Sequence, residues 1–197
     1  MANYTASDVK ELREKSGAGM MDCKGALDEA NGDIEKAFEF LRLKGLKGVS
    51  KREGRTTSNG LIVSRVGDGA GVLVELACET DFVAKAENFV TLADQVADAI
   101  AAAGAKNVED GLKATHDGKT VADLIVDKAA IMGEKVELRK VEVISAAGID
   151  AYMHRTSRDL PPQVGVLLGF DGADIETAHD IAVHIAAFSP TYLSRED

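Results

Sequence analysis

The sequence has 197 residues, of which 45% are apolar and 28% charged, and its formal net charge is −10. This composition is typical of a globular protein of one or two domains that is long enough to bury a core. The negative charge argues against binding to nucleic acid or to an anionic membrane surface, because such contacts need clustered positive charge. No apolar run in the sequence approaches membrane-spanning length.

The two cysteines, Cys23 and Cys78, do not have the spacing of a metal site. We expect both to be small buried thiols in a reducing compartment. The opening residues lead directly into a polar helix, so we expect no signal peptide and a cytoplasmic location.

Residues 1–44 predict three short helices. Thr5 is suited to cap the first helix, and Gly17 to Gly19 end it. The second helix spans Met20 to Ala30, and the third follows Asp33. Four small or apolar residues share one face of the second helix, namely Cys23, Ala26, Leu27 and Ala30.

Residues 45–58 predict a linker, because glycines and basic residues gather there and just before it. The basic residues are Arg42, Lys44, Lys47, Lys51, Arg52 and Arg55. We expect a solvated, partly helical linker. The alternative is a contact with an acidic partner surface or with RNA.

From residue 59 onwards the pattern alternates between strands and helices. The expected elements are a hairpin of strands 61–63 and 72–76 turning at 67–69, a helix 86–103, a polar connection 104–119, a helix capped by Thr120 and ending at 131, a strand 135–145, a hairpin of strands 150–155 and 164–170 turning at 158–162, and a helix 175–188.

The two hairpins and their helices predict an internal repeat. Gly71-Val72-Leu73-Val74 matches Gly165-Val166-Leu167-Leu168, and Ile100-Ala101-Ala102 matches Ile185-Ala186-Ala187. We therefore predict an α+β fold, with a three-helix domain at 1–44, a basic linker at 45–58, and two pseudo-repeated subdomains at 59–145 and 146–197.

The two copies differ in the length between strand and helix. From Gly71 to Ala93 there are 22 residues, whereas the matched positions Gly165 and Ala178 are 13 apart. We place the nine extra residues within 79–88 and expect a loop that the scaffold does not need. Insertions into loops on a rigid frame often carry function.

This stretch places an aromatic side chain, Phe82, beside the charge of Asp81. A ring of this kind that becomes buried against a partner contributes about 2 kcal/mol or more. The alternative is that Phe82 folds back onto its own core and Thr80 merely caps the next helix.

Thr80-Asp81-Phe82-Val83-Ala84-Lys85 resembles the signature loop of the bacterial translation elongation factor Ts family. The opening from Val9 to Lys24 resembles the same family, as do Tyr152-Met153-His154 and His184-Ile185-Ala186-Ala187. The resemblance follows the whole chain in order.

The resemblance implies a ubiquitin-associated-like N-terminal domain and a core of two related subdomains. It implies binding to the GDP form of elongation factor Tu and expulsion of the nucleotide, without catalysis and without a cofactor. The residues that it assigns to partner contact are Thr80, Asp81, Phe82 and Val83 in the loop near the nucleotide and its magnesium, Arg13, Met20, Met21 and Lys24 in the N-terminal domain, and His154 in the second subdomain.

Three departures from the family pattern stand out. The turn at 158–162 is longer and richer in proline than is usual in the family. Asp180 occupies a position where the family often has histidine. Longer members continue past Asp197 into a helical hairpin and a further partner-binding segment. Whether this chain forms a homodimer stays open.

The sequence also allows other interpretations. Met20 and Met21 are adjacent, so either one is buried or at least one is a contact surface. The four histidines lack the spacing of a metal site, and a Cys78–His154 nucleophilic pair lacks an orienting acid. No phosphate-binding GxxxxGK[ST] motif is present, so we expect no direct nucleotide binding. The main alternative function is a protein-binding adaptor that uses the N-terminal helices.

Overall fold

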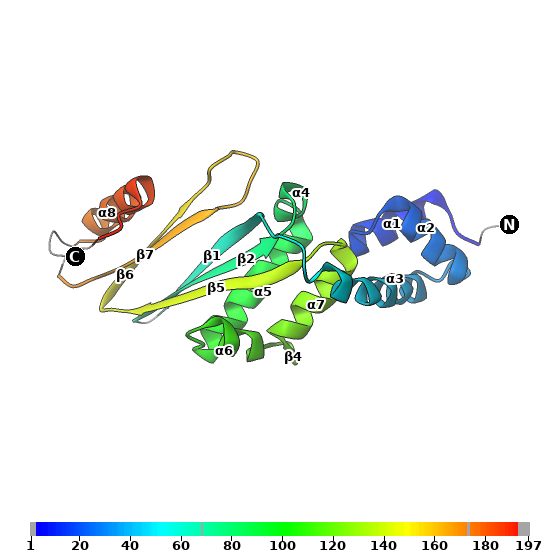
Figure 1. Cartoon of the computed structure of the whole chain (residues 1–197), viewed down its shortest axis with the longest axis horizontal. Coiled ribbons are helices and arrows are strands. Elements are labelled where there is room, and N and C mark those ends of the chain that lie inside the picture. The colour runs from blue at the N-terminus through cyan, green and yellow to red at the C-terminus, as the bar shows by residue number, and fades with distance from the viewer. Residues whose placement is uncertain (1–2, 68, 173, 193–197) are drawn as a thin grey trace.

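The computed structural model describes residues 3–67, 69–172 and 174–192, and shows an elongated arrangement of helices and antiparallel strands (Figure 1). The helices are α1 (Ala6–Ser16), α2 (Met20–Glu29), α3 (Ile34–Val49), α4 (Asp81–Ala84), α5 (Glu87–Ala103), α6 (Val108–Lys113), α7 (Val121–Met132) and α8 (Ile175–Phe188), with a 3₁₀ turn at Ser50–Arg52. The strands are β1 (Asn59–Gly67), β2 (Ala70–Cys78), β3 (Thr115–His116), β4 (Lys119–Thr120), β5 (Val136–Ser145), β6 (Gly148–His154) and β7 (Val164–Phe170). This mixture agrees with the predicted α+β class.

Helices α1 to α3 lie at one end of the molecule and enclose a core of their own (Figure 1). Thr5 caps α1 as predicted, in a capping box with Asp8, and Gly17 ends the helix in the left-handed conformation (φ 71°). The predicted apolar face of α2 is confirmed, since all four of its small residues are buried in this core.

Helix α3 continues five residues into the stretch predicted as a linker. The helical part of that prediction is confirmed, but residues 45–49 are not solvated throughout, because α3 packs along α7. A Cβ atom on the buried Gly45 would lie only 2.0 Å from the carbonyl oxygen of Ala130. Glycine is thus required for this close approach. Arg42 also pairs with Asp127 of α7 at 2.8 Å.

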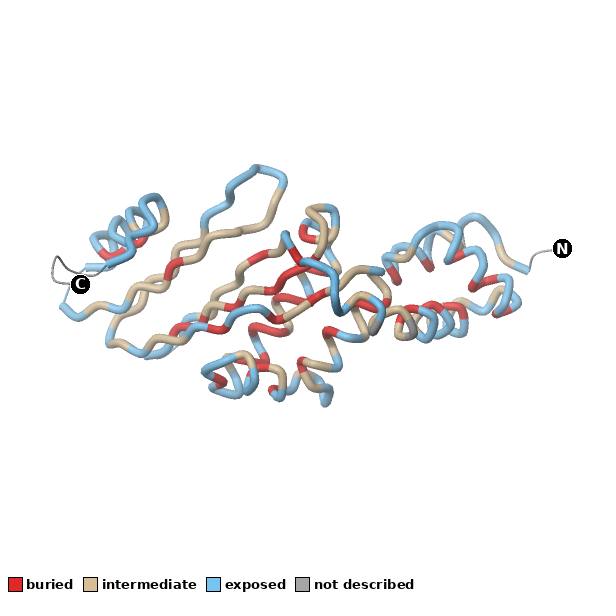
Figure 2. The backbone as a smooth tube through the Cα atoms, viewed as in Figure 1, coloured by how far each residue is buried: buried red, intermediate tan, exposed pale blue. Residues whose placement is uncertain are grey.

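The central sheet has the strand order β1-β2-β5, with both pairs antiparallel. One face of β2 presents Val72, Val74 and Leu76 to the main core, where α5 packs against the sheet. Buried residues accordingly concentrate along the middle of the molecule (Figure 2).

The opposite face of β2 packs against the second hairpin, β6–β7, in a reciprocal manner. A Cβ atom on Gly71 would lie 3.2 Å from Leu167, and one on Gly165 would lie 3.1 Å from Leu73. Each matched glycine therefore makes room for the matched leucine of the other hairpin, which supports the proposed internal repeat. Helix α8 covers β6 and β7.

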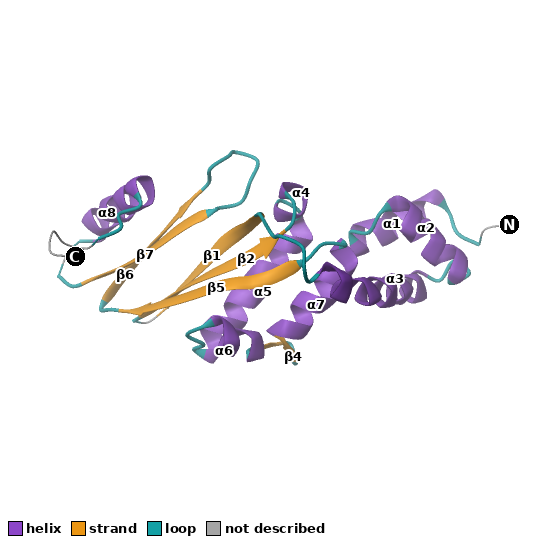
Figure 3. Cartoon of the chain, viewed as in Figure 1, coloured by secondary structure: helices purple, strands orange, loops and turns teal. Residues whose placement is uncertain are grey.

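Most of the predicted elements are confirmed (Figure 3). Strand β7 and helix α8 have the predicted bounds, and Thr120 caps α7 through the backbone N–H of Asp123. The prediction for residues 104–119 was wrong, because this connection contains α6, β3 and the start of β4. The predicted turn at 67–69 includes Asp68, which lies outside the described residues.

Candidate partner-binding site

The predicted loop after β2 is a one-turn helix, α4. The Thr80 hydroxyl oxygen accepts a hydrogen bond from the backbone N–H of Val83 at 3.3 Å, which caps the turn. Ala84, at the end of the turn, is fully buried in the main core. The prediction that this stretch has no structural role was therefore wrong.

The nine extra residues of the first repeat do not form one insertion. Strand β2 has nine residues and β7 has seven. The following connection spans 79–86 in the first copy and 171–174 in the second. Helix α5 also has more residues before its matched alanine, Ala93, than α8 has before Ala178. The extra length is thus shared between strand, connection and helix, and only the connection forms α4.

Phe82 projects from α4 and is 73% exposed, so the alternative that it folds onto its own core was wrong. Its ring is accompanied by Lys85, whose Nζ lies 4.6 Å from the ring centroid. The same Nζ lies 3.4 Å from a carboxylate oxygen of Asp81. An exposed pair of this length is weak, so both Asp81 and Phe82 can exchange Lys85 for a partner.

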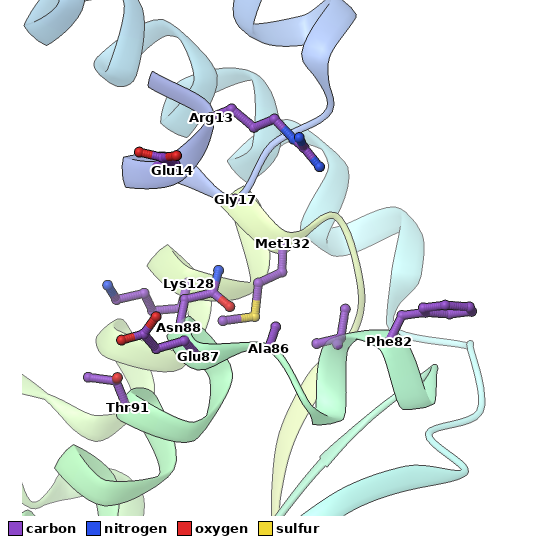
Figure 4. Close-up of a pocket in the computed structure, with 11 residues that line it drawn as sticks. Arg13, Glu14, Gly17, Phe82, Ala86, Glu87, Asn88, Thr91, Lys128 and Met132 are labelled. Carbon is purple, nitrogen blue, oxygen red and sulfur yellow. The ribbon is translucent and has the colours of Figure 1, made fainter. Parts of the chain in front are cut away.

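A groove of about 770 Å³ separates the end of α1 from α4, α5 and α7. Arg13 and Val83 both line it, together with Asn88, Lys128 and Met132. Met132 lies in the middle of the labelled side chains, while the Phe82 ring lies at the outer edge and points away from them (Figure 4). The groove therefore brings Arg13 close to the predicted contact residues of α4.

The start of α2 exposes two methionines. Met20 is 60% exposed and Met21 is 76% exposed, so the alternative in which one of them is buried was wrong. Met21 lines a second groove, of about 350 Å³, with Phe40 and Leu43 of α3. Lys24, one turn further along α2, is also exposed. Soft apolar side chains held in this way suit contact with another protein.

His154 lies at the end of β6 and does not line either groove. Its Nδ1 lies 3.1 Å from the hydroxyl of Tyr152. The ring of Tyr152 packs edge-on against His179 of α8, and Asp150 lies 3.1 Å from His179. The predicted contact residues thus occupy separate regions, with Arg13 near α4 and His154 on the second hairpin.

The Cys78 thiol, at the base of α4, is unsuited to act as a nucleophile. Burial, and then the negative charge of Glu134, raise the pKa of Cys78 to about 12, and the thiol donates to the carbonyl oxygen of Thr80 at 3.3 Å. At neutral pH the reactive thiolate is therefore scarce.

Within residues 3–67, 69–172 and 174–192, no three His, Cys, Asp or Glu side chains are grouped so as to hold a metal ion. None of the helices in this part of the chain is long and apolar enough to cross a membrane.

Sequence reasoning missed the side chain that anchors α4 from a distance. Glu134 accepts hydrogen bonds from Glu79 and Thr80, although it lies 54 residues from Thr80 in the sequence. No local pattern predicts such a long-range contact. Only the pairing of β2 with β5, which brings the two segments together, could have indicated it.

Comparison of the sequence with known proteins places the chain in the class of translation elongation factors. The family model described as "Elongation factor TS" matches residues 79–197. Elongation factor Ts of Micrococcus luteus is 56% identical over 200 residues, and that of Clavibacter michiganensis subsp. michiganensis is 57% identical over 197 residues. Each alignment covers 100% of this chain and 72% of the relative.

The chain belongs to the elongation factor Ts family. It is accordingly a translation elongation factor that acts in protein biosynthesis, in a family of exchange factors.

Proposed function

We propose that the chain binds elongation factor Tu in its GDP form and promotes release of the nucleotide, so that GTP can load. The observation that carries this proposal is the exposed aromatic tip of α4 on a fixed base. Phe82 is 73% exposed although its neighbour Ala84 is fully buried. A large apolar side chain held outward on a rigid frame is suited to insert into another protein.

In this proposal the chain breaks no bond. Factor and nucleotide each weaken the binding of the other, and the coupling free energy is the same in both directions. Weakening GDP binding about 10⁴-fold requires about 5.5 kcal/mol of differential binding. One side chain cannot supply this, so contacts elsewhere on the chain must contribute.

We assign these roles to the residues that the resemblance implies. Phe82 acts as a wedge that the closed form of the partner cannot accommodate. Asp81 brings negative charge close to the phosphates and to the magnesium ion of the partner, whose octahedral shell tolerates little distortion. Arg13, beside the groove, completes the contact from α1.

The remaining proposed contacts supply affinity. Met20, Met21 and Lys24 form an exposed surface on α2, and His154 forms another on β6. Since these surfaces are separate from α4, their loss should weaken binding of the partner more than it slows the release step itself. The cytoplasm, where bacterial translation occurs, is the proposed location.

Release of a fluorescent GDP analogue from elongation factor Tu, with and without this chain, tests the proposal. We expect the release rate to rise with chain concentration and then to saturate. A rate that does not depend on this chain would refute the exchange function. If the chain then still bound the partner, the adaptor alternative would be favoured.

A further inference from the structure

One carboxylate from the end of α7 holds the base of α4. Glu134 follows Gly133, which ends α7 in the left-handed conformation (φ 77°). One oxygen of Glu134 accepts hydrogen bonds from the backbone N–H groups of Glu79 and Thr80, both at 3.0 Å. The other oxygen accepts a hydrogen bond from the Thr80 hydroxyl at 2.5 Å. Three donors at the entrance to α4 therefore converge on one side chain.

The Thr80 hydroxyl extends this contact into α4. It donates its hydrogen to Glu134, and its oxygen accepts the backbone N–H of Val83 at 3.3 Å. Hydrogen bonds that form a chain of this kind strengthen one another. Loss of the carboxylate would thus weaken the cap as well as the three direct contacts.

A second carboxylate, that of Glu79 before α4, contacts the segment that follows α7. Glu79 accepts a hydrogen bond from the backbone N–H of Lys135 at 2.6 Å, and Arg55 lies 3.2 Å from the same carboxylate. The segment before α4 and the segment after α7 therefore hold each other. This reciprocal arrangement fixes where α4 begins.

Helix α4 needs this external support. A helix of four residues is too short to be stable by itself. Ala84 is its one fully buried side chain, whereas the Phe82 ring is largely exposed and the Asp81 side chain is half-exposed. The direction of these two side chains consequently depends on how the base of the turn is held.

We propose that Glu134 is a positioning residue for α4, which fixes the direction in which Asp81 and Phe82 meet the partner. A preorganised tip avoids the entropy cost of ordering α4 during association. The effect on nucleotide release rests on the proposed exchange function, whereas the effect on the order of α4 does not.

The order of α4 is tested first, in the free chain, by amide hydrogen exchange of wild type, Glu134→Ala and the control Glu142→Ala. Glu142 is an exposed glutamate on β5 whose ion pair, at 3.6 Å, is with Lys140 of the same strand. We expect exchange at residues 79–84 to become about tenfold faster in Glu134→Ala alone, with α5 and α7 unchanged. Unchanged protection of residues 79–84 would overturn the proposal.

If the alanine variant does not fold, Glu134→Gln replaces it in the hydrogen-exchange experiment. Its amide retains one acceptor oxygen and the volume of the side chain, so we expect a smaller rise in exchange at the same residues. Protection equal to that of wild type in this variant would likewise count against the carboxylate as the anchor.

The effect on function is tested by combining Glu134→Ala with Phe82→Ala in the GDP-release assay. We expect Glu134→Ala to slow the saturating release rate about tenfold, equivalent to about 1.4 kcal/mol. In the Phe82→Ala background the further loss should be less than about twofold, because there is no ring left to position. Equal slowing in both backgrounds would overturn the positioning role. If wild type does not accelerate release, the exchange function fails and hydrogen exchange still decides the role of Glu134.

Discussion

Replacement of Phe82 by alanine separates the role of the ring from the stability of the fold. The ring is 73% exposed, and its cation–π contact is with the ammonium group of Lys85. Its removal leaves no cavity in the core, so the free energy of unfolding should change by less than about 0.5 kcal/mol. The melting temperature of the free chain should therefore stay within about 2 °C of wild type.

The expected loss of activity follows from the exposed area of the ring. A phenylalanine side chain offers roughly 200 Å², so about 150 Å² of Phe82 is available for burial in a partner. At about 25 cal/mol per Å², complete burial contributes at most about 3.8 kcal/mol, or roughly 600-fold in rate. Because burial is seldom complete, we expect GDP release to slow by about 10- to 300-fold.

The assay is stopped-flow release of a fluorescent GDP analogue over a range of factor concentrations, which separates the saturating rate from the half-saturating concentration. Phe188→Ala is a matched control, because this ring is 71% exposed and lies at the end of α8. We expect this control to retain the saturating rate. A Phe82→Ala chain with the wild-type saturating rate would refute the wedge, even if its affinity were lower.

Two further predictions concern stability. Gly45→Ala should lower the free energy of unfolding, measured in urea, by about 2 kcal/mol, because the new Cβ would meet the Ala130 backbone. The control Gly25→Ala has open space around the new Cβ and should raise the free energy of unfolding by up to about 1 kcal/mol. Equal effects of the two substitutions would contradict the close approach of α3 and α7. The Cys78 thiol, with its pKa raised from 9.0 to about 12, keeps its proton in the folded state after it has ionised in the unfolded chain, so its stabilising contribution is complete below pH 9 and is lost as the pH rises towards 12. Above pH 9, the free energy of unfolding should therefore decrease less steeply with pH in Cys78→Ala than in wild type. An unchanged dependence on pH would contradict this reasoning.

Much of the fold could be predicted from local patterns. The bounds of β7 and α8 follow from a short apolar run and a long amphipathic one, and Thr5 and Thr120 are recognisable caps. Such signals depend on a few neighbouring residues, which a sequence displays directly. Residues 104–119 were missed, because the elements there are short and lie in a polar stretch with turn-forming residues.

The site was harder to predict, because its arrangement depends on contacts between distant segments. Glycine near basic residues suggested a linker, yet Gly45 is where α3 comes closest to α7. Sequence reasoning left open whether Phe82 is exposed or folds onto its own core, and the need for a fixed base beneath the exposed ring was not foreseen. That base depends on Glu134, whose importance is visible only once β2 and β5 are paired.

These contacts also connect the proposed affinity surface to the proposed wedge. Helix α2 packs on α3, and α3 packs along α7 at Gly45. Helix α7 ends at Met132, and Glu134, two residues further on, binds the entrance to α4. Binding energy gained at α2 can act on Phe82 only if the elements between them move as one unit, and this path consists of packed helices and a hydrogen-bonded carboxylate. Under the proposed exchange mechanism, stiffness along this path therefore matters in addition to the contact residues at its two ends, because a compliant frame would let α4 move back instead of displacing the partner's structure.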